Sequence, residues 1–80
     1  MTKLRVLSGK EVIKILEHFG FSVADTKGSH VKLRRTTDST GRQTLTIPDH
    51  RELDKGTLRA IFAQSIKYIP EADLRPYFYS

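Results

Sequence analysis

The 80-residue sequence has no cysteine and no tryptophan, and it has only three prolines. Without cysteine the chain can form neither a disulfide framework nor a thiolate metal site. No apolar run approaches the roughly 20 residues that a membrane-spanning helix needs. Residues 1–7 are too short and too interrupted by polar side chains for a signal peptide. We therefore expect one domain over residues 1–80, soluble, cytoplasmic and without a membrane partner.

Acidic residues are also scarce, since nine Asp and Glu stand against 14 Lys and Arg, for a formal net charge of +5. Most of this excess falls within residues 27–42, where five cations accompany one acid. The cations are Lys27, Lys32, Arg34, Arg35 and Arg42. Such a cluster is typical of a nucleic-acid-binding surface. It would equally protect a solvated strand edge from aggregation, so both interpretations stay open.

Residues 9–19 are predicted to form an amphipathic helix. Ser8 and Glu11 have the spacing of a capping box, in which each side chain bonds to the backbone N–H of the other residue. Apolar residues follow at helical spacing, namely Val12, Ile13 and Leu16. Gly20 then supplies a C-terminal stop.

Three strands are predicted at about residues 21–25, 30–36 and 43–47. Phe21 and Val23 should share one face of the first strand, because side chains alternate with period two. Polar, glycine-containing turns separate the strands, and Pro48 ends the third. The chain therefore predicts an antiparallel meander with one apolar and one basic face.

A second amphipathic helix is predicted over about residues 55–68, with Leu53 anchoring the loop before it. Pro70 ends this helix, and residues 71–80 should form one short turn with Leu74, Tyr77 and Phe78 packing back. The fold class is thus α+β in the order α-β-β-β-α, with both helices on one face of the sheet. The expected core consists of Val12, Ile13, Leu16, Val31, Leu33, Leu45, Ile47, Leu58, Ile61, Phe62 and Ile66.

His30 is the leading candidate for catalysis. Strand alternation places His30, Lys32 and Arg34 on the face opposite the helices, with the two cations about 7 and 13 Å along the strand. A neutral imidazole could take the proton from a ribose 2′-OH, while either cation stabilises charge on the phosphoryl oxygens. The alternative is a surface histidine that only bonds to a turn.

His50 and the start of the second helix are weaker candidates. His50 could be a second acid/base group or could simply cap the helix. No third ligand has suitable spacing for a two-histidine zinc site, so we expect no metal. Lys55, Thr57 and Arg59 could hold a phosphate at the helix N-terminus, or Thr57 could serve as an ordinary N-cap.

The segments Gly28-Ser29-His30, Ile47-Pro48-Asp49-His50 and Lys55-Gly56-Thr57-Leu58-Arg59 resemble the HicA toxin family over residues 6 to about 66. The resemblance implies a fold like the double-stranded-RNA-binding domain. It also implies an mRNA interferase, which is a metal-independent endoribonuclease that needs no cofactor. The family's catalytic histidine falls on His30, and the implied partner is a HicB-type antitoxin.

In this interpretation the RNA backbone is held by Lys27, Gly28 and Ser29 together with Lys32 and Arg34. Two other functions are compatible with the same sequence. One is a non-catalytic RNA-binding module of the same fold, whose basic face only binds phosphates. The other is a protein-binding domain whose basic face meets an acidic partner.

Overall fold

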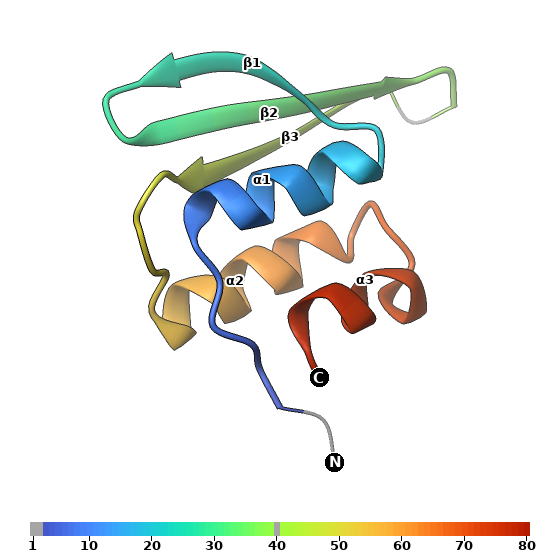
Figure 1. Cartoon of the computed structure of the whole chain (residues 1–80). Coiled ribbons are helices and arrows are strands. Elements are labelled where there is room, and N and C mark those ends of the chain that lie inside the picture. Colours follow the sequence, from blue (N-terminus) through green and yellow to red (C-terminus); the bar gives the residue numbers. More distant parts are fainter. Residues whose placement is uncertain (1–2, 40) are drawn as a thin grey trace.

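The computed structural model describes residues 3–39 and 41–80. Its elements are α1 (Gly9–His18), β1 (Ser22–Lys27), β2 (His30–Thr37), β3 (Gly41–Pro48), α2 (Lys55–Ser65) and α3 (Glu71–Phe78). The strands form a three-stranded antiparallel sheet in the order β1-β2-β3. The helices lie together on one side of this sheet (Figure 1), which confirms the α+β class.

Alternating apolar residues in β2 and β3 supply the sheet side of the core. Val31 and Leu33 of β2, and Leu45 and Ile47 of β3, are buried between exposed or half-buried neighbours. The helices and the loops between them cover these four residues with Leu7, Val12, Leu16, Phe21, Leu53, Leu58, Ile61, Phe62, Ile69, Leu74 and Phe78. The predicted core is therefore confirmed except at Ile13 and Ile66, which are only partly buried.

Helix α1 begins as its sequence predicts. The Ser8 hydroxyl accepts from the Glu11 N–H at 3.0 Å, and the Ser8 N–H donates to the Glu11 carboxylate at 2.8 Å. The two bonds satisfy backbone donors that the first turn of a helix leaves free. Bonding to Ser8 also lowers the pKa of the Glu11 carboxyl.

Phe21 and Val23 lie on the core side of the sheet as expected, since Val23 is paired with the buried Leu33, but the two residues differ in burial. Phe21 is buried ahead of β1, whereas Val23 is half exposed. The pairing of β1 with β2 shifts between Val23 and Asp25, so β1 carries a bulge there. A bulge adds one residue to a strand and interrupts regular alternation, which the sequence of this polar strand did not signal.

Helix α2 ends at Ser65, three residues earlier than predicted. The chain then forms a tighter, 3₁₀-like turn, in which the N–H groups of Lys67 and Tyr68 bond to carbonyls three residues back. This turn places Ile69 in the core and directs the chain into α3.

The C-terminal segment is a helix rather than the expected single turn. Leu74 and Phe78 of α3 are fully buried, and Tyr77 is partly buried, so the predicted packing is confirmed. Beyond α3, Tyr79 pairs with Leu4 in an antiparallel bridge that joins the two ends of the described chain. None of the helices in the described residues is long and apolar enough to span a membrane.

Candidate functional site

The sheet face opposite the helices presents a row of basic side chains from β2. His30 and Lys32 are exposed and Arg34 is half-buried, while the intervening Val31 and Leu33 are buried. The three side chains therefore share the outer face, with two fixed positive charges on the same strand as the imidazole.

Each of these residues has defined neighbours on the adjacent strands. Paired Cα positions are Lys27–His30–Pro48, Asp25–Lys32–Thr46 and Ser22–Arg34–Thr44. His30 thus lies between a second lysine and a proline that carries no N–H donor. The bulged strand β1 adds one acid to the basic face, because Asp25 is paired with Lys32.

The turn that leads into His30 is open. Gly28 has φ of +59°, in the left-handed region that favours glycine, and the whole segment Lys27–His30 is exposed. Nothing lies within 4 Å of the position where a Cβ would project from Gly28. A ligand backbone can therefore approach the turn closely.

Arg35, a member of the cationic cluster, faces the helices instead. Its guanidinium bonds to Gln43 Oε1 at 2.8 Å and to two backbone carbonyls, those of Phe19 at 2.9 Å and Tyr68 at 2.7 Å. It also lies over the Phe21 ring, 4.9 Å from the centroid. Arg35 thus ties the sheet to the ends of α1 and α2 and contributes little to the outer face.

Backbone hydrogen bonds join the turn before His30, the exit of β3 and the start of α1. The Asp49 N–H donates to the Ser29 carbonyl at 2.6 Å, and the Gly9 N–H donates to the His50 carbonyl at 2.8 Å. A Cβ on Gly9 would sit 2.1 Å from the Pro48 carbonyl oxygen, so only glycine allows this approach. Helix α1 therefore packs directly against the segment Pro48–His50, which lies beside His30.

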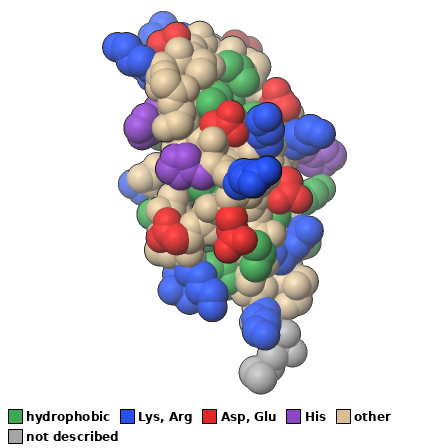
Figure 2. Space-filling view, turned by 60° about the vertical axis from the view of Figure 1, so that its left-hand side comes forward, with side chains coloured by type: hydrophobic (Ala, Val, Ile, Leu, Met, Phe, Trp, Pro, Cys, Tyr) green, Lys and Arg blue, Asp and Glu red, His purple; other side chains and the backbone are tan. Residues whose placement is uncertain are grey.

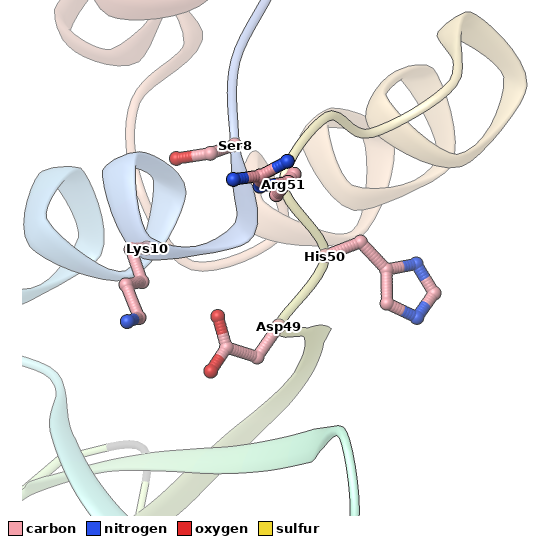
Figure 3. A pocket seen from close by; sticks show the side chains of 5 residues that line it. All are labelled: Ser8, Lys10, Asp49, His50 and Arg51. Atoms are coloured by element: carbon pink, nitrogen blue, oxygen red, sulfur yellow. The ribbon is translucent and has the colours of Figure 1, made fainter.

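A pocket of about 310 Å³ opens at this junction. It is lined by Ser8, Lys10, Asp49, His50 and Arg51. Figure 3 shows Lys10 and Asp49 pointing into the same space between α1 and the sheet, whereas His50 points away from them. Sequence reasoning proposed His50 here and did not propose Lys10, Asp49 or Arg51. Asp49 and Arg51 flank His50 in the chain, whereas Lys10 is brought to them only by the contact between α1 and β3.

Thr57 is not the N-cap of α2, and the phosphate site expected at this helix end stays a prediction. The N-cap is Asp54, whose carboxylate accepts from the Thr57 N–H and hydroxyl, so N-capping by Thr57 is wrong. These bonds lower the pKa of Asp54 and keep a negative charge at the helix end. Lys55 and Arg59 remain exposed, in the helix layer rather than on the outer sheet face (Figure 1).

Charges of both signs meet at the end of the molecule that carries these features. Figure 2 turns this end forward and shows histidines among lysine, arginine and acidic side chains. The row of His30, Lys32 and Arg34 lies on the outer sheet face, whereas this end of the molecule carries charges of both signs. Within residues 3–39 and 41–80, no three His, Cys, Asp or Glu side chains gather as metal ligands would.

The chain forms an antiparallel sheet that is backed by helices and carries an exposed histidine at one end. Its sequence also matches a known class of toxins. The family model described as HicA toxin of bacterial toxin–antitoxin matches residues 9–66, from the first residue of α1 to just past α2. The chain belongs to the HicA toxin family. A toxin of this kind acts with an antitoxin partner.

The matched range contains the sheet, the turn before His30 and the start of α2, but α3 lies outside it. No curated protein and no solved structure matches the chain significantly.

Proposed function

We propose that this toxin is an endoribonuclease that cuts messenger RNA without a metal ion and so inhibits translation. The observation that carries the proposal is the exposed His30 at the end of a strand that also presents Lys32 and Arg34 to the same face. His30 is the position on which the HicA catalytic histidine falls. The surface is open at Gly28, so that an extended nucleic-acid strand can reach the imidazole.

In the proposed reaction the neutral imidazole of His30 accepts the proton of a ribose 2′-OH. The 2′-oxygen attacks the adjacent phosphorus, the bond from phosphorus to the 5′-oxygen breaks, and the leaving oxygen takes up a proton. Lys32 and Arg34 stabilise the negative charge that develops on the phosphoryl oxygens. The products are a 2′,3′-cyclic phosphate and a 5′-hydroxyl.

The proton for the leaving oxygen has several candidate donors. They are His50, a lysine, water, and His30 itself in a second step. His50 follows Pro48 by two residues, and Pro48 is the strand partner of His30, which keeps His50 as the second acid/base candidate. Its ring points out of the pocket (Figure 3), toward solvent that a bound RNA would occupy.

The remaining contacts hold the RNA backbone. Lys27 and Ser29 flank the open turn, and Lys55 and Arg59 offer a second, separate pair of cations at the start of α2. We leave Thr57 out of the proposed phosphate contacts, because Asp54 already uses its donors. A HicB-type antitoxin would inhibit the enzyme by covering the outer sheet face, and both partners would work in the cytoplasm.

The test is cleavage of a long single-stranded RNA by the purified chain, free of antitoxin and in excess chelator. Wild type, His30→Ala and His18→Ala are compared at equal concentration. His18 is a matched control, because it is an exposed histidine at the last position of α1, outside the candidate site. We expect fragments from wild type and His18→Ala, and intact RNA with His30→Ala.

Equal cleavage by all three proteins would overturn the catalytic assignment of His30. No cleavage by any of them, combined with salt-sensitive binding, would instead establish the RNA-binding module of the same fold.

A further inference from the structure

We propose that the pocket beside His30 binds one base of the RNA, next to the cleaved phosphate, and favours guanine. The inference rests on the proposed ribonuclease function and adds to it a determinant of cleavage preference. The pocket, of about 310 Å³, lies at the lower end of the volumes that bind small organic ligands, which suits a single planar base.

The position of the pocket relative to His30 is fixed by the backbone. Asp49, on the pocket wall, directly follows Pro48, the strand partner of His30. Its N–H bonds to the carbonyl of Ser29, the residue before His30. The pocket thus opens on the helix side of the sheet, at the end that carries His30, and the proposal requires the RNA strand to pass around this end so that a neighbouring base enters the pocket.

The Asp49 carboxylate is the group that can read a base. It is exposed, and no hydrogen bond or ion pair occupies it within the described parts of the chain. An ionised carboxylate only accepts hydrogen bonds, through two oxygens. Guanine presents two adjacent N–H donors on its Watson–Crick edge, whereas the other three bases place an acceptor beside a donor there. Asp49 therefore favours guanine.

The other pocket residues have complementary roles. Lys10 and Arg51 are exposed cations that also line the pocket, and they would contact the phosphates that flank the bound base. The Ser8 hydroxyl already accepts from the Glu11 N–H in the capping box. His50 points away from Asp49 (Figure 3). Base selection thus depends on Asp49.

The test is cleavage of a randomised single-stranded RNA pool in chelator, followed by sequencing of the new 5′ ends. Wild type, Asp49→Asn, Asp73→Asn and His30→Ala are compared. Asp73→Asn, in the first turn of α3, removes the same charge from an exposed site outside the pocket. Asp49→Asn should keep the fold, because the backbone of Asp49, not its carboxylate, bonds to Ser29.

We expect wild type and Asp73→Asn to enrich guanine at one fixed position beside the cut. In Asp49→Asn this enrichment should fall by roughly 5- to 150-fold, the discrimination of one bidentate side chain–base pair, while cleavage continues. An RNA with inosine at that position lacks one of the two donors, so wild type should cut it more slowly than the guanine RNA.

Two results would overturn the inference alone: His30-dependent cleavage without guanine enrichment, or an unchanged profile in Asp49→Asn. Cleavage that is absent in wild type, or that persists in His30→Ala, would instead remove the proposed function and this inference with it.

Discussion

The three histidines of the chain occupy different environments. His18 packs edge-on against the Phe19 ring, with centroids 5.3 Å apart, and lies 5.6 Å from the Tyr77 ring. His50 lines the pocket at the exit of β3. His30 alone lies on the outer sheet face with Lys32, which makes it the histidine best placed to act on a phosphodiester.

Replacing Lys32 tests how much the cations of the outer sheet face contribute to RNA binding, independently of catalysis by His30. We expect Lys32→Ala to weaken RNA binding about fivefold, the effect of one solvent-exposed ion pair worth about 1 kcal/mol. The slope of log affinity against log salt should shrink by about 0.7, the value for one phosphate contact on a single strand. Binding isotherms at several salt concentrations measure both effects.

Lys67→Ala is the matched control, because Lys67 is an exposed lysine beyond the C-terminal end of α2. An equal loss of affinity in both variants would mean that net charge, rather than the outer face, governs binding.

At this scale the sequence predicts the direction of the side chains along β2, but not the role of each one. Period-two alternation correctly separates His30 and Lys32 from Val31 and Leu33. The same rule assigns Arg35 to the inner face but does not predict its role. Its partners Phe19 and Tyr68 are 16 and 33 residues away in the chain, so only the assembled fold brings them to the guanidinium.

Among the elements, the start of α1 does most to hold the candidate site together. Gly9 packs against the segment Pro48–His50, which in turn bonds to the turn before His30. Local pattern predicts the capping box of α1, because its residues are three apart. It does not predict the contact with β3, since that depends on residues about 40 positions away along the chain.

Gly9→Ala tests this contact. Alanine favours helix more than glycine does, so local propensity alone predicts stabilisation. The clash with the Pro48 carbonyl predicts instead a loss of about 1–3 kcal/mol, as in overpacked interiors. Urea denaturation measures this change, and single-turnover cleavage by the folded fraction should slow because the β3 exit is displaced.

Gly56→Ala serves as the control, because its Cβ would meet only one side-chain oxygen of Asp54, at 3.3 Å, and no backbone atom. Unchanged or raised stability in Gly9→Ala would contradict the described seating of α1.

For the whole molecule, α3 completes a core that the matched residues 9–66 leave open. Leu74 and Phe78 are fully buried, and Phe78 lies against Phe62 of α2 with ring centroids 5.3 Å apart. The sequence predicts that these tail residues pack inward, because they are large and apolar. It underestimates the length of the helix, because Pro76 within it argues against regular structure.

Leu74→Ala should therefore destabilise the fold by about 2–5 kcal/mol, the cost of a cavity at a fully buried leucine. Glu71→Ala, which breaks only the exposed ion pair with Arg75, should cost at most about 1 kcal/mol. Chemical denaturation of both variants compares them directly. Similar stabilities would show that α3 is not part of the core.

The fold as a whole follows from the sequence more completely than the site does. Element order through α2, sheet order and most core positions depend on local patterns, and these predictions are confirmed. The pocket with Lys10, Asp49 and Arg51 depends on how α1 meets β3, which no local pattern specifies.

The most direct measurement is the single-turnover rate constant for cleavage of one defined RNA oligonucleotide in excess chelator. Wild type and His30→Ala are compared, each also with an RNA that has a single 2′-deoxyribose at the cut site. We predict that His30→Ala lowers the rate constant by about 10²- to 10⁴-fold, and that wild type leaves the 2′-deoxy RNA intact at that site. Equal rates for the two proteins, or cleavage of the 2′-deoxy linkage, would contradict base catalysis by His30 on a ribose 2′-OH.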